Sequence, residues 1–274
     1  MLIVKGDGTK EPFDILKLKH SLNRSGAEPE IAARVAEKIA STIRDGMTTT
    51  EIYKRAYKLL GKTEGALAAR YSMRRAIFDL GPTGYPFEDF FSELMKRQGY
   101  TTHVRQIMQG LCSEHEVDVV LKKGGLTSGV ELKFHNSIGF KTDLKTALYV
   151  RARFTDIEDG ARKRNEECGI NEGWLVTNTK FTKSAIAYAE CAGVTLLGWS
   201  YPKKGNLADM IEESGIYPIT VLTTLSGAEK KQLLNAQVAL CSDIAKNPDM
   251  LSKVGIAKRK HEEIISESKL LCHA

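Results

Sequence analysis

The sequence predicts an α/β fold: a mixed sheet with helices on both faces, preceded by a small hairpin-plus-helix bundle and followed by a helical segment. Apolar and polar residues alternate in twos over 116–121 and 129–134, as they do in half-buried strands. A helix, a strand, a helix and a strand are then expected over 144–168, 173–177, 182–192 and 194–199. Strand, helix and strand in this order imply a parallel crossover, so the sheet is mixed.

Two turn-rich stretches divide the chain. Residues 81–86 (GPTGYP) concentrate the glycines and prolines that stop helices, and residues 201–206 (YPKKGN) follow an apolar run in the manner of a linker. We therefore predict domains over residues 1–83, 84–204 and 205–274.

The first domain is predicted to open with a hairpin. Leu2-Ile3-Val4 and the turn Gly6-Asp7-Gly8 favour a first strand and its turn, with a second strand over 10–13. Asp14 is expected to cap the first helix, Pro29 lies at the start of the second, and Thr49 or Thr50 is expected to cap the third. These helices and a fourth are expected over 15–25, 30–44, 51–60 and 64–79.

The other two domains contain further helices. Residues 88–98 (EDFFSELMKRQ) have helical spacing, with an apolar stripe formed by Phe87, Phe90, Phe91 and Leu94. In the last domain, Ser226 is expected to cap a helix over 228–240, and shorter helices follow. The pattern of this C-terminal segment does not indicate a function.

Composition and charge exclude several classes of protein. The chain has 40 Lys and Arg against 34 Asp and Glu, a net charge of +6, which permits contact with a polyanion without requiring it. No apolar run approaches the ~20 residues that cross a bilayer, so we expect no membrane segment and a cytoplasmic location. The 5 cysteines are widely spaced and never form CxxC, which argues against a disulfide framework or a zinc knuckle.

The most informative residues are charged side chains in the two alternating strands. Asp118 lies in the strand over 116–121, and Glu131 and Lys133 lie on one face of the strand over 129–134. Adjacent antiparallel strands bring such side chains within a few ångströms of each other. Two carboxylates in a partly desolvated sheet are costly unless they are compensated, and a divalent cation between them compensates both.

Hydrolysis of a phosphodiester needs this set of groups. Two carboxylates hold Mg²⁺ or Mn²⁺, which polarises the phosphate and activates water, while a lysine orients the water or neutralises the developing charge. Asp118, Glu131 and Lys133 have these roles available. A surface ion pair between Glu131 and Lys133 is the alternative, and an ExK triplet alone does not distinguish the two.

The wider arrangement resembles the PD-(D/E)xK nucleases, and within them the Mrr-type restriction endonucleases. The resemblance covers 85–201: YPFEDFFSELMKRQGY as the opening helix, HEVDVVL and VELKF as the site strands, and WLVTNTKFTKSAIAYAECAGVTLLGW as the closing βαβ unit. It implies a restriction-endonuclease-like core in which Asp118 and Glu131 bind the metal, Lys133 is the catalytic lysine, and Glu88 assists the metal site.

The first domain resembles the ATP-cone, a regulatory nucleotide-binding domain. The likeness covers 2–80 and is carried by Val-Lys-Gly-Asp-Gly at 4–8, followed by Glu11 and Lys17. It implies that Lys5 and Lys17 bind the phosphates of ATP or dATP, that Glu11 and Asp14 lie near the base or ribose, and that Thr49 approaches the adenine.

Together these resemblances predict a Mg²⁺-dependent DNA endonuclease, in restriction or defence, that ATP or dATP regulates. Cutting both strands of double-stranded DNA requires two active sites, so we expect a homodimer or a larger assembly. Two alternatives remain: a nucleotide-sensing DNA-binding regulator without cleavage, and a nuclease acting on branched DNA or RNA.

Overall fold

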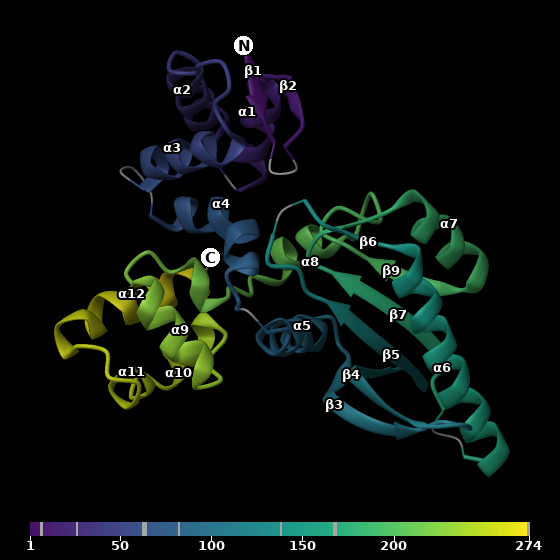
Figure 1. Ribbon diagram of the computed structural model, residues 1–274. Coiled ribbons are helices and arrows are strands. Elements are labelled where there is room, and N and C mark those ends of the chain that lie inside the picture. The colour runs from purple at the N-terminus through teal and green to yellow at the C-terminus, as the bar shows by residue number, and fades with distance from the viewer. Residues whose placement is uncertain are drawn as a thin grey trace. The chain divides into compact units, whose positions relative to one another are not determined.

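The structure is a computed structural model (Figure 1). It describes residues 1–5, 8–25, 27–61, 65–81, 83–137, 139–166 and 169–272. The chain forms two compact units, of which one joins Met1–Asp79 to Tyr217–Ala274 and the other is Leu80–Ile216. The predicted turn residues Gly6 and Asp7, the boundary residue Pro82 and the thiol of Cys168 lie outside the described residues.

The first unit begins with the predicted hairpin. Strands β1 (Leu2–Val4) and β2 (Lys10–Pro12) pair antiparallel, with Ile3 opposite Glu11. The hairpin covers a helical core that contains the buried side chains of Leu22, Ile39 and Leu60. The helices are α1 (Ile15–Arg24), α2 (Pro29–Ala40), α3 (Thr49–Gly61) and α4 (Gly65–Phe78).

Local sequence explains where these helices begin. Asp14 caps α1 as predicted, because its carboxylate accepts the backbone N–H groups of Leu16 and Lys17. The prediction that Thr49 or Thr50 caps α3 is wrong. Thr48 does so instead: its Oγ1 accepts the Glu51 N–H at 3.1 Å, and the Glu51 carboxylate accepts the Thr48 N–H at 2.8 Å.

The rest of the first unit is helical. Ser226 caps α9 as predicted, in a capping box with Glu229, but α9 ends at Asn235 rather than at residue 240. The chain then turns through Gln237, whose φ of 60° is incompatible with a continuing helix. The elements here are a 3₁₀ turn (Ile219–Val221), α9 (Gly227–Asn235), α10 (Cys241–Lys246), α11 (Met250–Lys253), a second 3₁₀ turn (Lys258–Lys260) and α12 (His261–Cys272).

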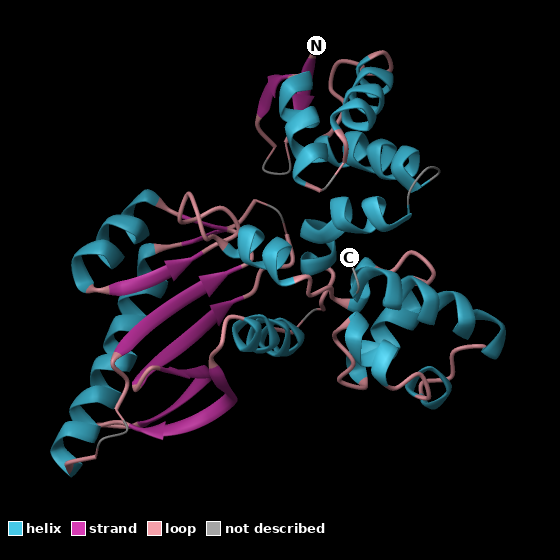
Figure 2. Ribbon diagram, turned by 180° about the vertical axis from the view of Figure 1, so that it is seen from behind, coloured by secondary structure: helices cyan, strands magenta, loops and turns pink. Residues whose placement is uncertain are grey.

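A 5-stranded mixed sheet forms the centre of the second unit, in the order β3-β4-β5-β7-β9 (Figure 2). Strands β3, β4 and β5 are antiparallel, whereas β5, β7 and β9 are parallel, so the predicted α/β fold class is confirmed. The strands are β3 (Thr101–Gln109), β4 (Glu114–Lys123), β5 (Leu126–Lys133), β7 (Glu172–Thr177) and β9 (Val194–Leu197).

Strand β3 was absent from the sequence prediction. Its residues (TTHVRQIMQ) are exposed or half-buried throughout, because β3 forms the edge of the sheet. An edge strand of this kind lacks the strict apolar alternation by which strands are recognised.

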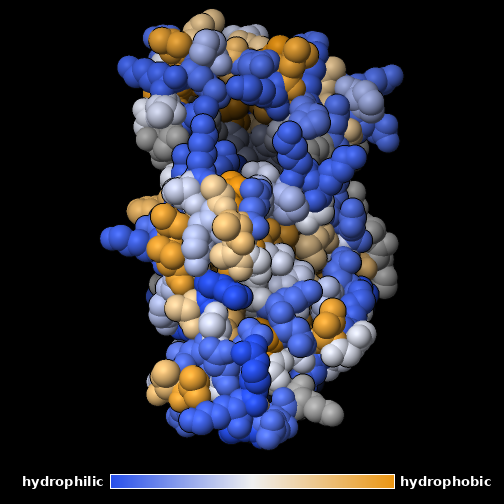
Figure 3. All heavy atoms as spheres, turned by 90° about the vertical axis from the view of Figure 1, so that its right-hand side faces the viewer, coloured by the Kyte–Doolittle hydropathy of each residue, from blue (hydrophilic) through white to orange (hydrophobic). Residues whose placement is uncertain are grey.

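Helices cover both faces of the sheet. Helix α5 (Tyr85–Arg97) packs on β3 and β4, and α8 (Leu207–Ser214) packs on α5. Helices α6 (Leu144–Arg164) and α7 (Lys183–Ala192) pack on the other face of the sheet. Figure 3 views the molecule from the side of these helices, where hydrophilic and hydrophobic residues are interspersed on the surface. Strand β6 (Lys141–Thr142), which precedes α6, and strand β8 (Lys180–Phe181), which precedes α7, form a separate two-stranded parallel sheet.

Glycines in the sheet let α6 approach closely. A Cβ built at Gly129 of β5 would lie 2.7 Å from the Phe154 ring, and one at Gly173 of β7 would lie 2.6 Å from it. Phe154 therefore fills the space above two neighbouring strands, and it fixes α6 over the strand that carries Glu131.

Two further findings concern membrane-spanning helices and cysteines. No helix in the described ranges is long and apolar enough to cross a membrane. The cysteines in those ranges, Cys112, Cys191, Cys241 and Cys272, are free thiols.

Candidate active site

Asp118 and Glu131 lie on neighbouring strands where the ladder between them ends. Val119 is the last residue of β4 before this point that pairs with β5, opposite Val130. Beyond it, the Asp118 side chain rather than a backbone carbonyl accepts a hydrogen bond from β5: Asp118 Oδ2 accepts the Leu132 N–H at 2.7 Å. The expected alternation of faces does not hold through this point, because Val117 and Val120 belong to one hydrophobic cluster. The distortion turns Asp118 toward β5.

Glu131 is a buried carboxylate held by two cations. Its side chain is 5% exposed, and Oε1 lies 3.2 Å from Lys133 Nζ, while Oε2 is paired with Nη1 of Arg153. Lys133 is 43% exposed on its side chain, so its ammonium group is accessible from solvent while it contacts the buried acid. Glu131 and Lys133 thus form an ion pair in which the acid is buried and the lysine reaches solvent.

Arg153 is a component of the site whose position was not expected. Its side chain is only 12% exposed and points inward from α6. Its Nη1 also donates to the Glu116 carbonyl at 2.8 Å, and its guanidinium lies 4.6 Å from the centre of the Tyr149 ring. Arg153 therefore neutralises Glu131 and joins α6 to β4.

The electrostatics of Asp118 indicate a shortage of positive charge. The pKa of Asp118 is raised from 3.8 to about 7: burial is the largest cause, the charges of Glu131 and Glu88 add to it, and the Leu132 N–H and Arg153 oppose the rise. Carboxylates that repel one another in this way are typical of functional sites.

Glu88 lies on α5 and is engaged by a second arginine. Arg105 of β3 donates to Glu88 Oε2 at 3.1 Å and to Asp89 Oδ1 at 2.8 Å. Burial raises the pKa of Glu88, and Arg105 partly offsets this. Arg105 has a φ of 51°, an unusual conformation for a residue with a side chain. In the β3–β4 register it lies opposite Asp118, since Val104 pairs with Val119 and Gln106 with Val117.

The donor set fits a hard divalent cation only in part. Asp118 and Glu131 offer the carboxylate oxygens that Mg²⁺ and Mn²⁺ prefer, and the raised pKa of Asp118 is what a nearby cation would reverse. Throughout the described ranges, however, no three His, Cys, Asp or Glu side chains form a group that could hold a metal ion. Glu88, predicted to assist the metal, contacts Arg105 instead.

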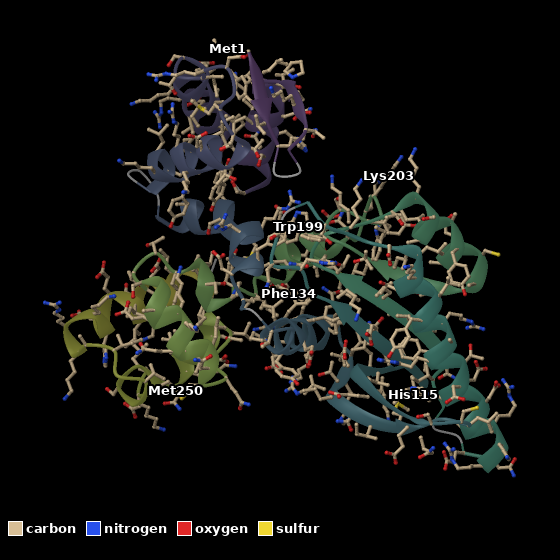
Figure 4. The ribbon with its side chains drawn as sticks, viewed as in Figure 1. Met1, His115, Phe134, Trp199, Lys203 and Met250 are labelled. Carbon is tan, nitrogen blue, oxygen red and sulfur yellow. The ribbon has the colours of Figure 1, made fainter. Side chains whose placement is uncertain are left out.

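The end of β5 beyond Lys133 is held by a buried amide. Asn178, fully buried after β7, accepts the His135 N–H at 2.9 Å and donates to the His135 carbonyl at 2.8 Å. Thr177 Oγ1 donates to the Lys133 carbonyl at 2.8 Å. Phe134, labelled in Figure 4, follows Lys133, and the centre of its ring lies 5.6 Å from that of Phe87 on α5. His115, also labelled there, forms a hydrogen bond with Asp156 of α6.

The predicted nucleotide site of the first unit is a cluster of exposed charges. Glu11 of β2 lies 2.7 Å from Lys5 Nζ and 3.2 Å from Lys17 Nζ, so the two lysines converge on one acid. These lysines lower the pKa of Glu11. Val4 bridges to Thr48, which brings Thr49 alongside the segment that carries Lys5. The Asp14 carboxylate is occupied in capping α1.

Sequence reasoning missed both Arg105 and Arg153 as residues that contact the acids of the site. No local signal marked Arg105, because β3 itself was not recognised. Arg153 lies within a helix rich in basic residues, and the sequence carried no sign that this one faces the sheet.

Comparison with known proteins matches each part of the chain to a family. Residues 1–79 match the ATP cone domain, residues 82–200 match a restriction endonuclease family, and residues 217–272 match the family described as AF1548-like, C-terminal. An uncharacterized protein of Archaeoglobus fulgidus is 37% identical over 179 residues, which cover 65% of this chain and 97% of that protein.

The chain belongs to the AF1548-like family. The crystal structure of a protein of unknown function, AF1548, has a TM-score of 0.58 and 35% identity over 70% of this chain and 99% of that one. This AF1548-like protein carries an Mrr-type restriction endonuclease domain behind an ATP-cone, as the sequence predicted. The exact domain boundaries and the roles of the individual site residues remain predictions.

Proposed function

We propose that the protein is a DNA endonuclease that hydrolyses phosphodiester bonds with Mg²⁺ or Mn²⁺ held by Asp118 and Glu131. The observation that carries the proposal is the convergence of these acids from β4 and β5, with Lys133 Nζ 3.2 Å from Glu131. The raised pKa of Asp118 supports it, since an ionised pair at this depth calls for additional positive charge.

The protein groups have separate tasks in this mechanism. A bound divalent cation supplies Lewis acidity at the scissile phosphate and lowers the pKa of a water molecule. Lys133, half-exposed beside Glu131, donates hydrogen bonds to a non-bridging phosphate oxygen or to the attacking water. Arg153 on α6 keeps Glu131 oriented, and Arg105 on β3 holds Glu88 of α5 in place.

The ATP-cone supplies the regulatory part of the proposal. We infer that Lys5 and Lys17 exchange their contact with Glu11 for the phosphates of ATP or dATP, because they form an exposed cationic pair. Glu11 and Thr49 then lie near the base or ribose, and Asp14 fixes the start of α1 behind them. Double-stranded DNA as substrate requires two active sites and hence a homodimer or larger assembly, in a restriction or defence role.

The direct test is cleavage of supercoiled and methylated plasmid with Mg²⁺, Mn²⁺ or EDTA, with and without ATP or dATP. Wild-type protein should nick or linearise plasmid only with metal, and Lys133→Met should lower the rate about 100-fold or more. Lys163→Met, at the exposed end of α6, is the matched control and should cleave normally. Metal-dependent cleavage that survives in Lys133→Met would remove Lys133 from the mechanism, and no cleavage of any substrate would favour a non-cleaving regulator.

A further inference from the structure

An exposed aromatic ring lies beyond the end of the strand that carries Lys133. All nine phenylalanines fall in the described ranges, and Phe140, at 62% exposed, is the one on the surface while the others are buried or half-buried. Phe140 lies in the connection between β5 and β6. Exposing a ring costs free energy, so its surroundings indicate whether it serves to bind something.

The Phe140 ring stacks on a ring that is itself held firmly. Its centre lies 5.7 Å from that of His135, with an angle of 6° between the planes. Asn178 fixes the His135 backbone through two hydrogen bonds, and His135 Nε2 lies 3.2 Å from Thr142 Oγ1. One face of Phe140 is thus supported, and the exposure of the ring leaves the other available to a flat partner.

Two exposed lysines adjoin this stack. Lys141 and Lys180 occupy paired positions of the parallel β6–β8 bridge, and both side chains are exposed. Within the described part of the chain, neither makes an ion pair. The acid that follows them, Asp143, is used to cap α6 by accepting the Thr146 N–H at 3.1 Å. Two like charges in register repel each other, and a chain of phosphates would compensate both.

We propose that Phe140, His135, Lys141 and Lys180 form a binding surface for unpaired DNA, which we name the Phe140 platform. One base stacks on Phe140, and the phosphates beside it contact the two lysines. Bases inside a duplex do not offer their faces, whereas a single strand does. The surface adjoins Lys133, so the proposal, which rests on the proposed function, narrows the substrate to DNA with an unpaired segment beside the cut.

Binding can be measured apart from cleavage. In EDTA, fluorescence anisotropy of the full-length protein with a labelled thymidine oligonucleotide of about 12 residues should give tighter binding than the duplex of equal length. Phe140→Ala should weaken single-strand binding about 10-fold or more, and Phe140→Trp should retain it. Leu126→Ala removes a side chain that is 51% exposed in the β4–β5 hairpin, and as the control it should bind normally.

The contribution of Lys141 and Lys180 can be tested separately, through the salt dependence of single-strand binding. Removing two phosphate contacts in Lys141→Ala, Lys180→Ala should lower the slope of log affinity against log salt by about 1.4. Lys163→Ala should leave the slope unchanged. Equal single-strand affinity for wild type and Phe140→Ala, or an unchanged slope in the double variant, would overturn the platform.

The outcome for the platform is separable from that for the nuclease. If wild type cleaves duplex with Mg²⁺ but Phe140→Ala binds single strands like wild type, the platform is wrong and the nuclease stands. If no substrate is cleaved yet Phe140→Ala loses single-strand affinity, the platform stands and the proposed function fails. Both are upheld when duplex with a single-stranded flap is cleaved faster than blunt duplex and Phe140→Ala removes that preference.

Discussion

Two carboxylates in the two units of this protein have pKa values that are shifted in opposite directions. Glu11 lies on the surface of the ATP-cone between Lys5 and Lys17, which lower its pKa. Asp118 lies inside the nuclease sheet, where burial and the charge of Glu131 raise its pKa to about 7. Lys133 lies 3.2 Å from Glu131 but does not prevent this rise in Asp118.

The difference follows from solvation. On the surface, water stabilises a carboxylate and a nearby lysine adds to that, so the acid stays ionised and ready to exchange partners. In the sheet, the ionised form loses its water, and the available cations are divided between two acids. The nuclease site therefore calls for one more cation, whereas the ATP-cone cluster has two lysines to one acid and can accept an anion that displaces Glu11.

The strongest test of this contrast removes Arg153. In Arg153→Met, buried Glu131 keeps only the half-exposed Lys133, and the free energy of unfolding should fall by about 3 kcal/mol. Urea denaturation at neutral pH measures the change. Adding Glu131→Gln to the variant should recover most of the loss, because no charge is then left buried. Arg151→Met on the same helix is the control, and an equal loss there would remove the special role of Arg153.

The pH dependence of stability sharpens the contrast at Asp118. Between pH 4 and pH 7 the folded protein holds a proton on Asp118 that the unfolded chain releases, so this group lowers stability as the pH rises through that window. Asp118→Asn keeps an oxygen that can accept the Leu132 N–H but removes the charge. Above pH 7, in EDTA, the variant should be more stable than wild type by about 1–3 kcal/mol.

Thermal denaturation between pH 4 and pH 9 measures that effect. The gain of Asp118→Asn should disappear toward pH 4, where the wild-type carboxylate is protonated in the folded state. Glu213→Gln, an exposed acid on α8, should show no such profile. A gain that is independent of pH would contradict the raised pKa of Asp118.

In the ATP-cone the expected effects concern affinity rather than stability. Lys5→Ala or Lys17→Ala should weaken ATP and dATP binding about 10-fold, since each removes one charge-assisted contact to a phosphate. Isothermal titration calorimetry measures this, with Lys10→Ala on β2 as the control. The melting temperature should stay close to that of wild type, because the cluster is exposed. Unchanged affinity in both variants would show that the nucleotide, if bound, lies elsewhere.

The smallest expected effect is on stability and concerns Thr48, which caps α3. Thr48→Ala removes the Oγ1 that accepts the Glu51 N–H, and should lower the free energy of unfolding by about 1 kcal/mol. Thr50→Ala, within the first turn of α3, should cost less in the same denaturation series. The reverse order would restore the sequence-based assignment of the cap.

Much of the fold was predictable because it depends on neighbours in sequence. Asp14, Pro29 and Ser226 marked the starts of helices that the structure contains. The alternating pattern predicted β4 and β5 and drew attention to their acids, because a charged residue within an apolar strand can be recognised from the sequence alone. The edge strand β3 was missed because its half-exposed residues leave no period.

The sequence by itself determined the α/β class and the carboxylates and lysine that were candidates for chemistry, because alternation, caps and charge are local properties. Tertiary structure alone decided which arginines reach them: Arg105 comes to Glu88 from β3, and Arg153 to Glu131 from α6. It also decided that Asp118 titrates near neutral pH, since desolvation and repulsion depend on distances between segments that are far apart in the chain.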